Sequence, residues 1–141
     1  MENILKPEQK IHFSSIGTEK EFYTDKQFLK TILINLLSNA IKFSPANGII
    51  DLVSIIGPDQ LLLKVIDKGI GIPEQEQKHL FNRFFRARNA LNIEGTGLGL
   101  NIIKKYVEIL KGTVSVESQL GVGTKFTISI PAQGMSLLEG K

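Results

Sequence analysis

The spacing of apolar residues switches along this chain between the period of a helix and the period of a strand. Three helices are predicted by the helical spacing, over residues 25–43, 74–85 and 98–110. Asp25 is a suitable N-cap for the first helix, and Pro45 opposes its continuation. Gly112 is predicted at the C′ position of the last helix, because glycine adopts the left-handed conformation that commonly ends a helix.

Runs of β-branched and apolar residues predict strands over residues 10–13, 48–56, 61–67, 113–118 and 124–130. Gly57-Pro58-Asp59 and Gly121-Val122-Gly123 are turn sequences, and they indicate that the strands on either side form hairpins. Helices interspersed with hairpins favour an α/β sandwich, in which helices cover one face of a mixed sheet.

Size and charge limit the classes of function. The chain has 141 residues, enough for one domain, and a net charge of only +3, which does not indicate nucleic-acid binding. It has no cysteine, so disulfides and thiolate metal sites are excluded, and no apolar run has the length of a membrane-spanning helix. We expect residues 10–131 to form the domain, residues 1–9 to be a linker remnant and residues 132–141 a C-terminal tail.

Two asparagines and a lysine lie close together on one side of the first predicted helix. Asn35 and Asn39 are four residues apart, and Lys42 follows three residues later. An amide oxygen can coordinate Mg²⁺, and a lysine can contact a phosphate. The alternative is an ordinary solvated helix face, and these three residues alone do not decide between the two.

A carboxylate and two glycines follow the predicted strand at residues 61–67. Asp67 opens the segment Asp67-Lys68-Gly69-Ile70-Gly71-Ile72, and its carboxylate can accept a hydrogen bond from an amino group such as that of adenine. Glycines let the backbone approach a flat ring closely. Taken alone, the segment is better explained as an ordinary turn after a strand.

A glycine-rich segment, Gly95-Thr96-Gly97-Leu98-Gly99-Leu100, lies at the start of the last predicted helix. Unpaired N–H groups at a helix start bind anions, and glycines allow close approach. The segment follows an expected mobile loop at residues 86–94 rather than a strand, so it does not fit a dinucleotide-binding fingerprint. It also has no Walker-type lysine, and alone it is weak evidence for a phosphate site.

The order of these motifs resembles the catalytic ATP-binding (HATPase_c) domain of two-component sensor histidine kinases. Their superfamily, GHKL, includes type II topoisomerases, heat-shock chaperones and mismatch-repair ATPases. The segments similar to the N, G1, F and G2 boxes and to the last glycine turn are residues 35–43, 67–72, 81–84, 95–100 and 121–124. The resemblance implies the Bergerat fold, an α/β sandwich whose mixed, mainly antiparallel sheet carries about three helices on one face.

The resemblance also implies ATP and Mg²⁺ as cofactors and assigns roles to the metal and phosphate residues. Asn39 would ligate Mg²⁺, with Asn35 as a second ligand or a support, and Lys42 would contact phosphate. Arg86, in the lid at residues 86–94, would reach the γ-phosphate. The phosphates would meet the backbone of the G2 box, at Gly95, Thr96, Gly97, Leu98, Gly99 and Leu100.

At the base end, the resemblance assigns adenine recognition to Asp67, which would bond the amino group. Thr124 would lie nearby and help to fix the ring through a water molecule. Gly71 would admit the ring. The remaining residues that would border the nucleotide are Phe43, Gly69 and Ile72.

The position of Asn35 indicates the class of reaction. Hydrolytic members of the superfamily carry a glutamate there that orients water, and an amide cannot act as a general base, so transfer to another nucleophile is favoured. Neither His12 nor His79 lies in the sequence context of the family's acceptor histidine. The resemblance therefore implies an acceptor on a separate dimerisation domain, with a response regulator downstream, and no nucleic-acid partner.

The expected location is the cytoplasm, without direct membrane contact by this domain, although the parent protein could be membrane-anchored. Two other functions stay open. One is a serine kinase of the anti-sigma type, against which the F-box-like segment at residues 81–84 argues. The other is a module that senses nucleotide and transfers nothing, against which the intact Asn39 and Asp67 argue.

Overall fold

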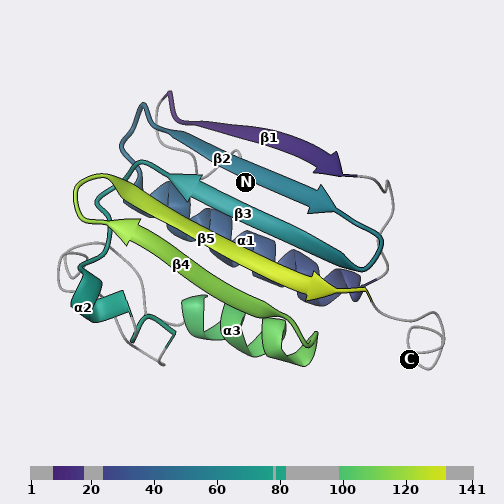
Figure 1. Cartoon of the computed structure of the whole chain (residues 1–141). Coiled ribbons are helices and arrows are strands. Elements are labelled where there is room, and N and C mark those ends of the chain that lie inside the picture. The colour runs from purple at the N-terminus through teal and green to yellow at the C-terminus, as the bar shows by residue number, and fades with distance from the viewer. Residues whose placement is uncertain (1–7, 18–23, 78, 82–98, 133–141) are drawn as a thin grey trace.

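A computed structural model of the chain describes residues 8–17, 24–77, 79–81 and 99–132 (Figure 1). Within these ranges, one five-stranded sheet has the order β1-β2-β3-β5-β4. Strands β1 and β2 are parallel, and the other neighbouring pairs are antiparallel. The elements are β1 (Lys10–Gly17), α1 (Lys26–Phe43), β2 (Ile49–Ile56), β3 (Gln60–Asp67), α2 (Glu74–Gln77), α3 (Gly99–Ile109), β4 (Thr113–Gln119) and β5 (Gly123–Pro131).

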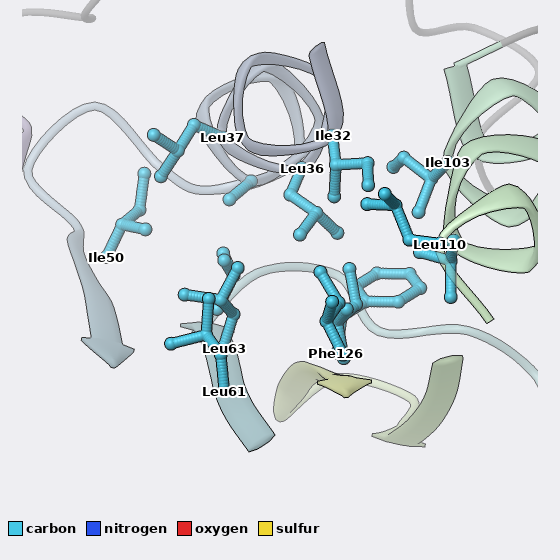
Figure 2. Packing of buried hydrophobic residues seen from close by; sticks show 14 of the residues in the cluster. Ile32, Leu36, Leu37, Ile50, Leu61, Leu63, Ile103, Leu110 and Phe126 are labelled. Atoms are coloured by element: carbon cyan, nitrogen blue, oxygen red, sulfur yellow. The ribbon is translucent and has the colours of Figure 1, made fainter. Parts of the chain in front are cut away.

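The molecule has two layers, because α1 and α3 lie on the same face of the sheet (Figure 1). The core fills the space between the layers. Figure 2 shows Leu36 of α1 and Leu110 after α3 directed towards the strands, where Leu63 and Phe126 point back at them. Each such buried side chain contributes roughly 1.5–3 kcal/mol of hydrophobic stabilisation. The predicted α/β sandwich with helices on one face is confirmed.

Helix α1 begins and ends where the sequence predicts. Asp25 is the N-cap, and its carboxylate accepts a hydrogen bond from the Phe28 N–H at 3.0 Å. Ser44 is the extended C-cap residue before Pro45. None of the helices in the described ranges is long and apolar enough to cross a bilayer.

The residue at the C′ position after α3 differs from the prediction. Lys111 has a φ of 62°, and its N–H donates to the Glu108 carbonyl at 2.9 Å, while the Gly112 N–H donates to the Val107 carbonyl at 2.8 Å. These two bonds form a Schellman motif with Lys111 at C′ and Gly112 one residue later. Glycine is required at 112 for another reason, because a Cβ there would lie 2.2 Å from the Ser129 carbonyl oxygen.

Helix α2 is shorter than the predicted helix over residues 74–85. Its four residues are followed by turns at residues 79–81, and the His79 N–H donates to the Glu76 carbonyl at 3.1 Å. None of the four residues of α2 is buried, and the next buried apolar side chain is Leu80, so little packing supports a longer helix. Residues 82–85, and the predicted loop at 86–94, lie outside the described residues.

The N-terminal strand is longer than predicted and is preceded by a buried residue. The sequence predicts residues 10–13, but β1 continues to Gly17, and the Ser54 hydroxyl bonds the Ser15 hydroxyl at 3.0 Å across to β2. Gln9 is buried, and its side-chain amide donates to the Ile41 carbonyl at 3.1 Å. At least this residue of the predicted linker therefore packs against the end of α1.

Candidate functional site

A row of three polar side chains crosses the helix-facing side of the sheet at one end. Asp67 on β3 pairs in register with Thr124 on β5, and Thr124 pairs with Ser118 on β4. Directly paired residues of an antiparallel ladder lie on the same face, with Cβ atoms about 5 Å apart. The next row towards the middle of the sheet is apolar, with Val65, Phe126 and Val116. The sheet therefore places these three polar side chains at the border of its core.

Asp67 is nearly buried, with 7% of its surface exposed. Burial raises the pKa of its carboxyl to about 6, although the backbone N–H groups of Gly69 and Thr124 oppose this rise by hydrogen bonding. The Gly69 N–H lies 2.8 Å from the Asp67 Oδ1 atom. A carboxylate has about four lone-pair positions, so the two backbone donors leave room for a further hydrogen bond from a ligand.

The loop from Lys68 to Pro73 is fastened to the hairpin of β4 and β5. The Ile70 carbonyl accepts from the Gly121 N–H at 2.8 Å, and the Ile72 N–H donates to the Ser118 hydroxyl at 2.8 Å. The Gln77 side-chain amide bridges both partners, because it donates to the Ile72 carbonyl at 3.0 Å and to the Ser118 carbonyl at 3.1 Å. These bonds hold the loop beside Asp67 in one conformation.

The two glycines of this loop are required by close backbone approach. A Cβ on Gly69 would lie 2.1 Å from the Phe43 carbonyl oxygen, at the end of α1. Gly71 has a φ of 74°, and a Cβ there would lie 2.2 Å from the Gln119 carbonyl oxygen. Backbone packing therefore accounts for both glycines. The role of Gly71 and Ile72 towards a bound ring stays a prediction.

Helix α1 carries the second group of predicted site residues. The Asn39 side-chain nitrogen is buried, and it has no hydrogen-bond partner among the residues that the structure describes. The Asn35 side-chain nitrogen donates to the Thr31 carbonyl at 2.8 Å, one turn earlier in the helix. Lys42 is exposed in the last turn, and Phe43 is half-buried at the helix end next to Gly69. The structure therefore brings the end of α1 into contact with the loop that follows Asp67.

These residues are suited to Mg²⁺ only when a ligand supplies further oxygens. The described part of the chain holds no cluster of three or more histidine or acidic side chains that could bind a metal. Mg²⁺ is commonly held by one or two protein oxygens together with substrate phosphates and water. The buried Asn39 amide would suit such a site, because its oxygen could coordinate the ion and its nitrogen could donate to a phosphate.

The phosphate end of the predicted site lies largely outside the described residues. Arg86, Gly95, Thr96, Gly97 and Leu98 all fall there. Gly99 is the first residue of α3, as the prediction of a glycine-rich helix start requires, and Leu100 packs against the core.

Three polar residues near this site were missed by the sequence analysis. Asn101 of α3 donates to the Phe81 carbonyl at 3.0 Å, and it thereby fastens the helix start to the turn after α2. Ser118 and Gln77 fasten the loop after Asp67. For Ser118 a signal existed, because it is a hydroxyl at an inward position of an alternating strand.

Comparison with known proteins identifies a family for the chain. Residues 24–134 match the family described as histidine kinase-, DNA gyrase B-, and HSP90-like ATPase. The chain is 43% identical to the circadian input-output histidine kinase CikA of Synechococcus elongatus over 114 residues, which is 79% of this chain. The chain spans only 15% of the length of that relative.

Two solved structures share the fold. The mycobacterial sensor histidine kinase MprB is 34% identical, with a TM-score of 0.75 over 89% of this chain and 86% of that one. Full-length ShkA in complex with AMPPNP is 25% identical, with a TM-score of 0.76 over 89% of this chain and 26% of that one.

Proposed function

The chain belongs to the family of histidine kinase-, DNA gyrase B-, and HSP90-like ATPases, and we propose that it binds ATP with Mg²⁺ and presents the γ-phosphate to a histidine on a separate domain. Its similarity to CikA and MprB, both histidine kinases, supports a kinase rather than another branch of the family. The expected resemblance to the catalytic domain of sensor histidine kinases is confirmed at the level of the family.

Adenine recognition is proposed for the polar row at the end of the sheet. The Asp67 carboxylate is the acceptor for the adenine amino group, and Thr124 beside it supports the same edge of the ring, directly or through water. A hydrogen bond that involves a charged group contributes about 1.5–3 kcal/mol, enough to orient the base. The AMPPNP complex of ShkA, which shares this fold, is consistent with a nucleotide in such a site.

The observation that carries the proposal is the buried Asn39 amide, whose nitrogen has no partner in the described part of the chain. An unsatisfied buried polar atom costs about 1–3 kcal/mol, so its retention is explained if a ligand satisfies it. A nucleotide phosphate and its Mg²⁺ would supply both the acceptor and the cation. Lys42, exposed one helical turn further along α1, would add positive charge at the phosphates.

Transfer rather than hydrolysis is proposed because of Asn35. Its amide nitrogen is held by the Thr31 carbonyl, and an amide provides no general base for an attacking water. Phosphoryl transfer depends mainly on positioning and charge stabilisation, so an acceptor imidazole can attack without a strong base from this domain.

The partners and the setting follow from the same proposal. The acceptor lies on a dimerisation domain, a response regulator takes the phosphate onward, and the domain works in the cytoplasm. Residues 10–131 are proposed as the catalytic domain, which the start of β1 at Lys10 and the end of β5 at Pro131 support.

The experiment is a calorimetric titration of the full chain with ATP, with Mg²⁺ and with excess chelator. The parent chain should bind ATP more tightly when Mg²⁺ is present. The Asn39→Ala variant should lose most of this difference, because the amide that contacts the ion is gone. Asn47→Ala removes the same amide group from an exposed turn and should behave like the parent. If Asn39→Ala keeps the full effect of Mg²⁺, Asn39 is not the ligand.

The transfer step is measured with γ-labelled ATP in the same series. The parent chain alone should retain no acid-labile phosphate, and label should appear on an added dimerisation domain that carries an acceptor histidine. Asn39→Ala should slow that transfer. Label on a serine of a small partner protein would favour the anti-sigma type of kinase, and binding without any transfer would favour the nucleotide-sensing module.

A further inference from the structure

The Ser118 hydroxyl makes three hydrogen bonds beside the proposed adenine site. Its oxygen lies 2.8 Å from the Ile72 N–H, 2.9 Å from the Gly123 carbonyl oxygen and 2.8 Å from the Thr124 hydroxyl. It is half-buried on the helix-facing side of β4, in register with Thr124. A serine hydroxyl has one proton to donate and two lone pairs with which to accept. Three partners therefore use its full capacity.

The identity of these partners fixes the direction of each bond. The Gly123 carbonyl has no proton, so the serine proton must lie between the two oxygens, and Ser118 donates there. The Ile72 N–H can only donate, so Ser118 accepts from it. The contact with Thr124 then has no serine proton left, and the threonine hydroxyl must donate to Ser118. Thr124 is left with lone pairs only.

Thr124 is the cross-strand partner of Asp67, on the same face of the sheet. With its proton committed to Ser118, the hydroxyl presents an acceptor next to the acceptor oxygens of the Asp67 carboxylate. We propose that Ser118 is a specificity-determining residue, which selects adenine over guanine by holding the Thr124 hydroxyl as a hydrogen-bond acceptor. This inference rests on the proposed function of the site as an ATP-binding site.

The two purines differ at the position that meets these acceptors. Adenine carries an amino group with two N–H donors, which can satisfy both Asp67 and Thr124. Guanine carries a keto oxygen at the same place, so acceptors would face an acceptor. A free threonine hydroxyl could rotate and donate to the keto oxygen, and the bond to Ser118 prevents this rotation. Leaving buried polar groups unpaired is the strongest way for a site to reject a similar ligand.

The test is the ratio of ATP to GTP affinity, both with Mg²⁺, measured by calorimetry on the full chain. The parent chain should prefer ATP. In Ser118→Ala the Thr124 proton is released, and the ratio should narrow about tenfold, the size expected for one or two hydrogen bonds. Ser115→Ala removes an exposed hydroxyl from the same strand on the opposite face, and it should keep the parent ratio.

A double-mutant cycle separates this role from a purely structural one. Thr124→Val should narrow the ratio by itself, and adding Ser118→Ala to it should change the ratio no further. Two results would overturn the proposal. One is that Ser118→Ala weakens ATP and GTP binding equally. The other is that Ser118→Ala narrows the affinity ratio as much in the Thr124→Val background as in the parent chain. If the parent chain binds neither nucleotide, the proposed function itself fails, which is a distinguishable result.

A second pair of variants decides the matter if Ser118→Ala does not fold. Ser118→Thr keeps a hydroxyl at position 118, so the ratio of ATP to GTP affinity should stay at the parent value. Ser118→Val removes that hydroxyl and leaves a side chain of nearly the same volume as threonine, so it should narrow the ratio. Narrowing of the ratio by both variants to the same extent would contradict the proposal.

Discussion

At the scale of single residues, Asp67 shows a conflict between stability and binding. Burial of the carboxyl raises its pKa to about 6, which means that the folded chain without ligand disfavours the ionised form. The proposed adenine contact needs that form as an acceptor. The residue therefore weakens the unliganded fold near neutral pH, and a bound adenine would supply the missing donor.

The first prediction concerns the pH dependence of stability. Because the folded-state pKa of Asp67 is raised, the folded chain binds more protons than the unfolded chain between pH about 4 and 6, so this contribution to stability falls as pH rises through that window. The unfolding free energy of the parent relative to Asp67→Asn should fall by on the order of 2 kcal/mol between pH 4 and 7.5. Urea unfolding of both proteins at each pH measures this difference in unfolding free energy. A difference that does not change with pH would contradict the raised pKa of Asp67.

At the scale of elements, the chain after α3 meets two separate requirements at neighbouring positions, Lys111 and Gly112. Lys111 adopts the left-handed conformation, and Gly112 provides the close approach to β5 at Ser129. The chain places its glycine where the sheet excludes a Cβ and tolerates a lysine where the backbone favours glycine. Packing between elements therefore overrides the local preference at this helix end.

The second prediction uses this arrangement. Lys111→Gly should raise the unfolding free energy by about 0.5–1 kcal/mol, because a left-handed conformation costs a residue with a Cβ more than it costs glycine. Lys104→Gly, an exposed position inside α3, should lower it by about 1 kcal/mol. Denaturant unfolding compares the two variants with the parent. If Lys111→Gly lowers the unfolding free energy as much as Lys104→Gly does, Lys111 does not adopt the left-handed conformation.

At the scale of the whole molecule, the proposed site is assembled from both layers. Asp67 and Thr124 come from the sheet, Asn39 from α1, and the loop after Asp67 contacts the end of α1 through Gly69. A ligand bound between these parts would stabilise the folded state against the unfolded chain, because the unfolded chain does not bring them together.

The third prediction is a thermal shift. At an ADP·Mg²⁺ concentration of about 100 times Kd, the gain is about 2.7 kcal/mol, or a rise in Tm of roughly 8 °C for a domain of this size. At the same ADP concentration, Asp67→Asn should show a much smaller rise. Asp51→Asn, on the opposite face of the sheet beside His12, should show the parent shift. An equal shift in Asp67→Asn would exclude Asp67 from the binding site.

Most of the elements and the order of the motifs could be predicted from the sequence, although the extents of α2 and β1 could not. Local periodicity and turn residues were sufficient for α1, for both hairpins and for the fold class, since these signals act over a few neighbouring residues. The cap at Asp25 was equally local. The resemblance to a family rested on motif order, and comparison with known proteins confirmed it.

How residues far apart in the sequence meet depends on the packing of the whole domain. The row of Asp67, Thr124 and Ser118 depends on the pairing of β3 with β5, and these strands lie far apart in the sequence, so no local signal sets their register. The need for glycine at Gly69 and Gly112 comes from backbone that approaches from other elements. These contacts join segments far apart along the chain, so packing of the whole domain determines them and local preference does not.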